Sequence, residues 1–269
     1  MKNITVATKE NVGYYNIMVE SCKRNNIELI ILGLGQKWEG LHMKFKLWLN
    51  YLNTLPDNEI IMVNDAYDII ILEDSKTILT KFKKFNKPIV FSYQDGFLIN
   101  SVFNKCLEKV ICSGNFIGYV KNIKEVIKII LKNENKWPKH NKGDQNILNT
   151  ICQISPYIKN NIALDLNQDI FFVTSGDDFF YYKYYINGFI KNLKMKNNQL
   201  LNKNNKPISV LHLAANLNGN IYLQYLNYDI STVNSTGDYR IQQMFQFIKH
   251  FLNKYKYIIL IIIVFFLII

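Results

Sequence analysis

Short apolar runs alternate with segments of helical periodicity along the first third of the chain. Runs rich in branched apolar residues are separated by stretches in which apolar side chains recur every three or four positions. This alternation indicates β-α-β units, and therefore an α/β fold with a Rossmann-like, mostly parallel twisted sheet and helices on both faces. The expected strands cover 3–8, 27–35, 59–63 and 88–93, and the expected helices cover 12–25, 43–55 and 75–85.

The second half of the chain is less regular but carries elements of both kinds. With no internal repeat and no Pro/Gly-rich linker, the 269 residues favour one large domain. A turn and strand are expected over 113–120, a late strand over 207–213, and helices over 122–135, 144–154 and 240–255. We therefore assign 1–230 to an α/β domain, 231–256 to an amphipathic helix or linker, and 257–269 to a hydrophobic tail.

The tail YIILIIIVFFLII (257–269) contains no charge and follows Lys254 and Lys256. As a helix it reaches about 20 Å, which is short of the roughly 30 Å hydrocarbon core unless Tyr255 and its neighbours are included. Burial as a core strand or helix is the alternative. We expect a C-terminal hydrophobic helix that anchors the chain in a membrane, with the lysines and the domain on the cytosolic side. The start, MKNITVATKE, does not resemble a signal peptide.

The charge and the cysteines give only general indications about partners and compartment. The net charge is +11, but the lysines are scattered rather than clustered. This pattern favours a general compositional bias over a polyanion-binding surface, so we expect no specific nucleic-acid partner. The four cysteines show no CxxC pair and no zinc spacing, and we expect isolated thiols in a reducing compartment.

Two carboxylates interrupt an otherwise apolar run, IIMVNDAYDIIIL (60–72). Asp65 and Asp68 follow the expected strand 59–63, and ligands of doubly wound sheets bind beyond the carboxyl ends of the strands. Carboxylates about one turn apart offer oxygen ligands to Mg²⁺ or Mn²⁺ and leave positions for phosphate oxygens. The alternative is a polar turn that Asp65 begins and Asp68 caps, with no metal ion.

Five segments occur together and in register: NITVATKE (3–10), LGLGQKWEG (32–40), NDAYD (64–68), SGNFIG (113–118) and LDLNQDIF (164–171). They resemble the glycosyltransferase domain of the procollagen lysyl hydroxylase family, from about Thr5 to about Tyr228. The resemblance does not include that family's hydroxylase domain. It implies a GT-A fold, a UDP-sugar donor, and Mn²⁺ (or Mg²⁺) held by the DxxD pair and a distal histidine.

The resemblance assigns a role to several residues. Asp65 and Asp68 match the DxxD pair, and His212 in PISVLHL matches the histidine, although a lone histidine at a strand end is more often a hydrogen-bonded core residue. Thr8 matches a position near the uracil and ribose, with a helix N-cap as its alternative. Asn64 belongs to the donor site with the pair that it precedes.

Three further residues match the donor side of the family's site. Lys44 aligns with a lysine near the donor phosphates; a solvated helix face is its alternative, and Lys46 is a rival. Asp144 and Gln145, in KGDQNIL, match a stretch beside the transferred sugar. A carboxylate there orients hydroxyl groups or stabilises positive charge at the reacting carbon. A helix N-cap is the alternative for Asp144.

Some parts of the family pattern are altered. Only Asp144 remains of several acidic residues before the DQ pair, FSYQDGFLIN lacks the family's tryptophan, and Ala214 stands where the family has the asparagine of an HGN turn. We predict a metal-dependent enzyme that moves a hexose, glucose first, from a UDP-sugar to (galactosyl-)hydroxylysine of a collagen-like or other protein acceptor. The alternatives are a non-catalytic UDP-sugar or glycan-binding module, and a membrane-tethered polyanion binder. Retention or inversion and the general base stay open.

Overall fold

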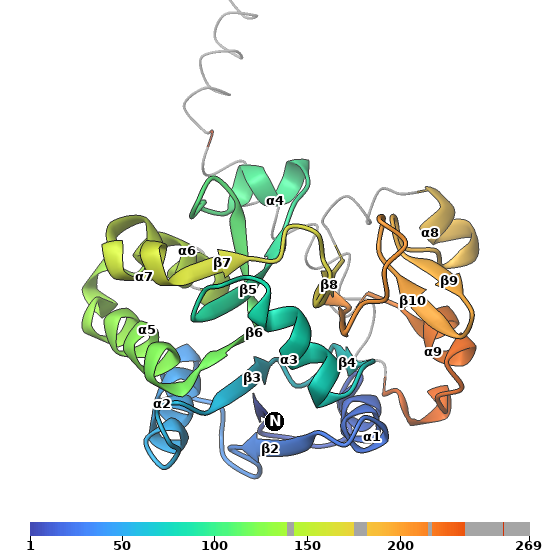
Figure 1. Cartoon of the computed structure of the whole chain (residues 1–269), viewed down its shortest axis with the longest axis horizontal. Coiled ribbons are helices and arrows are strands. Elements are labelled where there is room, and N and C mark those ends of the chain that lie inside the picture. Colours follow the sequence, from blue (N-terminus) through green and yellow to red (C-terminus); the bar gives the residue numbers. More distant parts are fainter. Residues whose placement is uncertain (139–142, 175–181, 215–216, 235–254, 256–269) are drawn as a thin grey trace, which may run out of the picture.

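The computed structural model describes residues 1–138, 143–174, 182–214, 217–234 and 255, and shows a mixed α/β fold around a six-stranded sheet (Figure 1). The strand order is β2-β1-β3-β6-β5-β7. The strands are β1 (Lys2–Val6), β2 (Glu28–Leu32), β3 (Ile60–Asn64), β5 (Ile89–Gln94), β6 (Val110–Tyr119) and β7 (Ile162–Leu164). The predicted α/β class is confirmed.

The predicted mostly parallel sheet is found with one exception, because the central strand β6 runs against both of its neighbours. β1 runs parallel to β2 and β3, and β5 runs parallel to β7, but β6 is antiparallel to both β3 and β5. Between β5 and β6 the chain forms the short helix α4 (Phe97–Val102) and a reversal in which Cys106 and Lys109 exchange backbone hydrogen bonds. A parallel pair requires a crossover connection, and this reversal replaces it.

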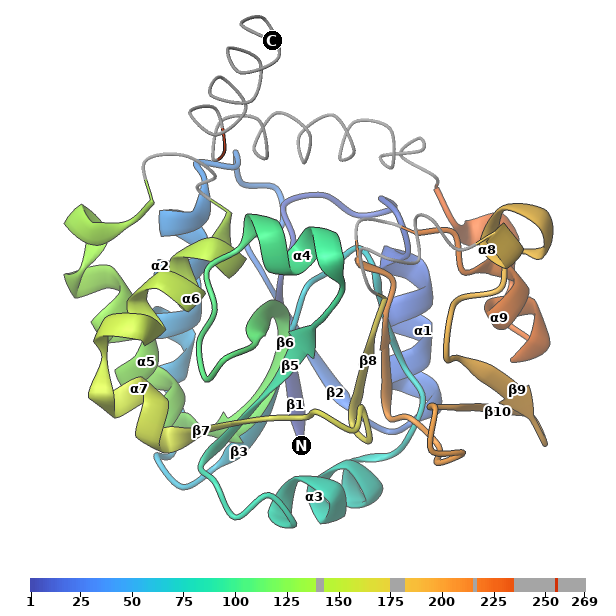
Figure 2. The same cartoon turned by 90° about the horizontal axis from the view of Figure 1, so that it is seen from above.

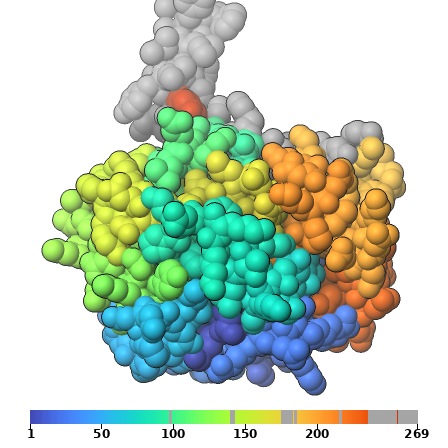
Figure 3. All heavy atoms as spheres, in the orientation of Figure 1, coloured from blue at the N-terminus to red at the C-terminus, as the bar shows by residue number. Residues whose placement is uncertain are grey.

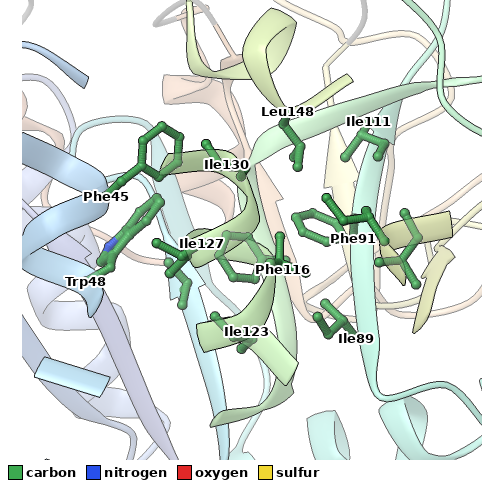
Figure 4. Close-up of a cluster of buried hydrophobic side chains, with 14 of the residues drawn as sticks. Phe45, Trp48, Ile89, Phe91, Ile111, Phe116, Ile123, Ile127, Ile130 and Leu148 are labelled. Atoms are coloured by element: carbon green, nitrogen blue, oxygen red, sulfur yellow. The ribbon is translucent and has the colours of Figure 1, made fainter. Parts of the chain in front are cut away.

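Helices cover both faces of the sheet, as expected. One face carries α2 (Leu41–Leu52), α5 (Val120–Lys132), α6 (Asp144–Ile154) and α7 (Pro156–Asn161), whereas α1 (Tyr15–Arg24) and α3 (Ser75–Lys83) lie on the other side (Figure 2). Side chains of β3 alternate between two cores: Ile61 and Val63 enter the first, and Met62 enters the second. In the first core, Phe45 and Trp48 of α2 meet Ile127 and Ile130 of α5 (Figure 4).

A smaller sheet, with the order β4-β11-β8, packs beside α1. It consists of β4 (Ile69–Ile71), β8 (Phe171–Val173) and β11 (Val210–His212), and β4 is antiparallel to β11. We did not predict β4, because its three isoleucines continue the apolar run that contains the two acids. Outside this sheet lie α8 (Tyr182–Asn187), the hairpin of β9 (Lys194–Lys196) and β10 (Gln199–Leu201), α9 (Asn220–Tyr225), and the short 3-10 helices η1 (Glu134–Lys136) and η4 (Ile230–Thr232).

Lys81 joins α3 to the region of the small sheet. Its Nζ lies 2.6 Å from Glu73 Oε2 and donates to the carbonyl oxygens of Asp169 and Pro207 at 2.9 and 2.7 Å. The space-filling view shows the α3 region in the middle of this face, in contact with the orange C-terminal segments (Figure 3). Lys81 therefore ties helix α3 to the segments that flank the small sheet.

Two further predictions concern the C-terminal segment and the four cysteines. The tail 257–269 and nearly all of the helix 240–255 lie outside the described residues, and within the described part no helix is long and apolar enough to cross a membrane. The membrane anchor and the cytosolic placement stay predictions.

The expectation of four isolated thiols is wrong: Cys106 and Cys152 form a disulfide, while Cys22 and Cys112 are free and buried. Packing of α6 on β6 brings the pair together across 46 positions, a spacing that matches no motif.

Candidate active site

Asp65, Asp68 and His212 meet at the carboxyl edge of β3. Each offers one ligand atom, and these atoms all lie within 4.8 Å of one another. β3 ends at Asn64 and β4 begins at Ile69, so both acids lie in the link between the two sheets. β11 pairs with β4, which places His212 opposite Ile69 and its Nε2 3.2 Å from Asp68 Oδ2. The unpredicted strand β4 is thus the reason that the predicted histidine reaches the predicted acids.

Gly114 makes room for this meeting. A Cβ atom at position 114 would lie 2.4 Å from His212 Cε1 and 2.9 Å from Asp65 Oδ2. The Gly114 carbonyl also accepts a hydrogen bond from the Asp65 amide at 2.7 Å. Sequence reasoning identified the SGNFIG segment but gave its residues no role, although a glycine within an apolar strand signals close approach of another group.

Lys44 of α2 links Asp65 to Asp144. Its Nζ lies 2.7 Å from Asp65 Oδ1 and 2.5 Å from Asp144 Oδ2, and the side chain is buried, whereas Lys46 is exposed. Burial by itself lowers the pKa of Lys44, but the Asp144 and Asp65 carboxylates outweigh it and raise that pKa above its ordinary value. Lys44 is therefore a permanent ammonium at the centre of the site.

Burial and neighbouring charges also shift the pKa values of Asp144, Asp65 and His212. Burial favours the neutral form of Asp144, but the Lys44 ammonium dominates and lowers the pKa of this carboxyl. For Asp65, burial prevails over Lys44 and raises the pKa. Burial also favours neutral His212, yet the adjacent Asp68 carboxylate holds the pKa of His212 well above its ordinary value.

The three residues fit a divalent cation. Two carboxylates and one imidazole form a donor set that can hold a divalent cation. Asp68 Oδ1 is buried and has no hydrogen-bond partner among the described residues. A buried carboxylate oxygen without a donor is costly, and a bound cation removes that cost.

Asp144 and Gln145 begin helix α6 next to this group. Gly143 occupies the N-cap position and Asp144 is the first helical residue, so the N-cap alternative for Asp144 is wrong. The Asp144 carboxylate accepts hydrogen bonds from the Gln145 amide at 2.9 Å and from Ser113. Gln145 Nε2 donates to Gln94 Oε1 at 2.9 Å, which fixes the side chain of Gln145 at the edge of the sheet.

Thr8 and Asn64 lie at the same edge in different surroundings. Thr8 follows β1, and α1 begins only at Tyr15, so the N-cap alternative for Thr8 is wrong. The backbone amides of Thr8 and Lys9 donate to the hydroxyl of Tyr67, which stands between the two acids in sequence, each at 3.2 Å. Asn64 is buried, and its Nδ2 donates to Asn3 Oδ1 at 2.9 Å. Asn64 therefore supports the edge of the sheet from within.

The fold resembles that of a glycosyltransferase of known structure. The crystal structure of the galactosyltransferase LgtC, in complex with donor and acceptor sugar analogues, aligns over 89% of this chain and 99% of that chain, with a TM-score of 0.52 at 12% sequence identity. At this identity the likeness shows the fold alone.

The chain belongs to the family described as the PLOD GT domain, whose model matches residues 1–227. Human procollagen-lysine,2-oxoglutarate 5-dioxygenase 2 is 27% identical over 192 residues, which covers 64% of this chain and 25% of that protein. The multifunctional procollagen lysine hydroxylase and glycosyltransferase of Caenorhabditis elegans is 28% identical over 185 residues, covering 61% of this chain and 24% of that protein. The chain thus spans about a quarter of the length of these relatives. The predicted family and enzyme class are confirmed.

Proposed function

We propose that this domain transfers a hexose, glucose in the first instance, from a UDP-sugar to a hydroxyl group, with Mn²⁺ or Mg²⁺ held by Asp65, Asp68 and His212. The observation that carries this proposal is the convergence of the three ligand atoms within 4.8 Å at the carboxyl edge of β3. The family membership and the LgtC-like fold support a sugar-nucleotide donor.

Each residue of the site has a part in the proposed reaction. The cation supplies positive charge that stabilises the diphosphate leaving group as the bond to the sugar breaks. Lys44 adds an ammonium beside Asp65 and is held there by two carboxylates. We assign to Asp144, on the other side of Lys44, the binding of sugar hydroxyls or the stabilisation of positive charge at the reacting carbon. Gln145 extends that surface, and the Thr8 loop is assigned to the nucleoside.

The acceptor belongs to the same proposal. The relatives are named for procollagen lysine hydroxylation, and one is also named as a glycosyltransferase. We therefore assign hydroxylysine, or galactosyl-hydroxylysine, of a collagen-like protein as the first acceptor to examine. The alternative acceptor is a hydroxyl group of another protein that is not collagen-like.

The test is release of UDP by the full chain across a panel of UDP-sugars, with Mn²⁺, Mg²⁺ or EDTA. We expect turnover with one donor that EDTA abolishes, and loss of turnover in Asp65→Asn and His212→Gln. Asp57→Asn is the matched control, because Asp57 is an exposed acid in the turn before β3. A folded protein that binds UDP but releases none from any donor would overturn the enzymatic proposal in favour of a UDP-sugar-binding module.

A further inference from the structure

A cavity of about 180 Å³ lies at the end of the small sheet opposite to the candidate active site. Pro207 and Ile208, which precede β11, line this cavity, whereas His212 ends β11 beside the two acids. Four positions along the chain separate Ile208 from His212, which is about 13 Å at roughly 3.3 Å per strand residue. The cavity is therefore distinct from the candidate active site.

The floor of the cavity is apolar and its opening is polar. Leu200, Ile208 and Tyr228 are buried and form the floor. Asn198 and Gln199, from the β9-β10 hairpin, are exposed and border the opening. Small-molecule sites combine an apolar lining with a few polar groups in this way. A matching ligand has an apolar face and a polar edge.

The charged side chains among the described lining residues already have partners. Arg24 is paired with Glu20, one turn before it in α1, and Glu73 Oε2 lies 2.6 Å from Lys81 Nζ. The two pairs together carry no net charge. An ion that entered this cavity would lose its hydration without gaining a counter-ion, and that loss is costly. The ligand that fits is therefore uncharged.

Two fixed side chains offer acceptor atoms to such a ligand. Asn25 Nδ2 donates to the carbonyl oxygens of Ser21 and Ile71 at 2.9 and 3.1 Å. Because a backbone carbonyl only accepts, both hydrogen atoms of this amide are used there, and Oδ1 is the atom left for a ligand. Glu73 Oε2 accepts from Lys81, whereas Oε1 has no hydrogen-bond partner among the described residues. Hydroxyl groups that donate to these two oxygen atoms match this wall.

The remaining walls supply a rigid surface and adaptable polar groups. The guanidinium carbon of Arg24 lies 3.9 Å from the centroid of the Tyr228 ring, and two backbone carbonyls of the segment after α9 accept hydrogen bonds from the same guanidinium. At the opening, the side-chain amides of Asn198 and Gln199 make no hydrogen bond within the described part of the chain. An amide both donates and accepts, so these two groups match hydroxyl groups in either role. Binding to a wall that is already ordered costs little conformational entropy.

We propose that this cavity is a second carbohydrate-binding site, which holds one uncharged hexose ring. A pyranose ring has apolar C–H groups for the floor, and its hydroxyl groups donate to the two acceptor oxygens and accept from the amides at the opening. The volume equals the share of about six water molecules in the liquid, so it encloses one ring and leaves further sugar units outside. The sugar held here is not transferred and its binding needs no metal ion. The inference therefore goes beyond the proposed function and does not rest on it.

Saturation-transfer difference NMR on the full chain tests this site, with methyl α-glucoside and methyl β-galactoside as probes. We expect at least one of the two glycosides to bind in EDTA, and its dissociation constant to stay the same when UDP and Mn²⁺ saturate the active site. Gln199→Trp places an indole ring in the opening and should abolish the signal. Gln224→Trp is the matched control, because Gln224 is exposed on α9 and does not line the cavity.

A second variant removes hydrogen bonds without adding bulk. Asn198→Gly/Gln199→Ala deletes both amides at the opening, and glycine keeps the backbone of position 198, where φ is +56°. Each lost hydrogen bond should weaken binding by about two- to tenfold. Circular dichroism and thermal unfolding check that all three variants fold as the wild-type protein does.

Several results would overturn the proposal. Neither glycoside binds, or binding survives in Gln199→Trp, or UDP with Mn²⁺ displaces the sugar and so places it in the active site. Binding of lysine amide in place of the glycosides, lost in Gln199→Trp, would assign the cavity to an ammonium group instead. None of these outcomes involves UDP release, so failure of this inference and failure of the proposed function are distinguishable.

Discussion

Lys44 Nζ lies 2.7 Å from Asp65 Oδ1, so a lysine from helix α2 contacts a carboxylate that we assign to the metal ion. The same ammonium lies 2.5 Å from Asp144 Oδ2. Lys44 therefore separates two carboxylates that would otherwise repel each other inside the site. Its position makes the stability of this edge of the protein depend on one positive charge.

Replacing Lys44 tests this dependence. Lys44→Met leaves Asp65 and Asp144 without their cation, and removal of one partner from a buried ionic group costs about 3–5 kcal/mol. We expect the free energy of unfolding in urea to fall by that amount and Mn²⁺ to restore part of it. Lys46→Met, on the exposed side of the same helix, should change it by less than about 0.5 kcal/mol. Equal effects of the two substitutions would contradict the role given to Lys44.

A methyl group at Gly114 tests the close approach of Asp65 and His212. Gly114→Ala places a Cβ atom 2.4 Å from His212 Cε1, so the imidazole must move and Mn²⁺ affinity should fall at least about tenfold, as for loss of ligand orientation. Gly118→Ala is the control, because its Cβ would lie 2.6 Å from the Pro88 carbonyl oxygen, away from the site. Both variants should lose thermal stability, but only Gly114→Ala should bind Mn²⁺ more weakly in the folded protein. Wild-type affinity in Gly114→Ala would refute this geometry.

The affinity for a metal ion should depend on pH through His212. Asp68 raises the pKa of His212, and a protonated imidazole has no lone pair at Nε2 to offer. Metal binding therefore releases a proton, so affinity is full above the pKa of His212 and falls about tenfold per pH unit below it. Because the pKa of His212 is raised, the metal affinity should begin to fall at a pH well above the usual pKa of a histidine. Isothermal titration across about pH 6 to about pH 9 in two buffers of different ionisation enthalpy measures both the slope and the proton.

His42→Gln is the control for that titration, since His42 is a partly exposed residue of α2 beside Glu134 and should leave the profile unchanged. A dissociation constant that did not vary over this pH range would show that His212 is not a ligand.

The sequence predicted the two acids and the histidine but not the way in which they meet. The apolar run before Asn64 is long enough to identify a buried strand, so the acids that follow it belong to the sheet edge. The isoleucines after Asp68 continue the same run, and periodicity alone does not show that a second sheet begins there. The pairing of β4 with β11 is non-local and has no signal in either segment.

The buried polar residues around the site were harder still to predict. Ser92 and Asn115 lie inside buried strands, and the partners of each lie on another element. Their meaning comes from tertiary contacts, because a polar residue in a strand indicates only that some partner exists. The antiparallel placement of β6 was missed for a similar reason: the reversal at 106–109 contains no Gly, Pro or Asn to announce it.

The disulfide provides the last test. Cys106 precedes β6 and Cys152 lies in α6, the helix whose first residues are Asp144 and Gln145. Closing a loop of 46 residues restricts the unfolded chain and stabilises the fold by about 4 kcal/mol in the chain-entropy description. We expect reductant to lower the free energy of unfolding by about that amount, and Cys152→Ala to lose this sensitivity. Cys22→Ala, which alters a free buried thiol, should keep it.

Thiol titration in denaturant measures this bond directly. Protein purified without reductant should show two reactive thiols, from Cys22 and Cys112, and four after reduction, because the chain has four cysteines. Four reactive thiols before reduction would show that Cys106 and Cys152 are reduced. In that case α6 is held on β6 by packing and by the hydrogen bonds of the buried Asn149 side chain to the backbone of Ile111 at 2.9 and 2.8 Å. The position of Asp144 then depends on those contacts rather than on a covalent link.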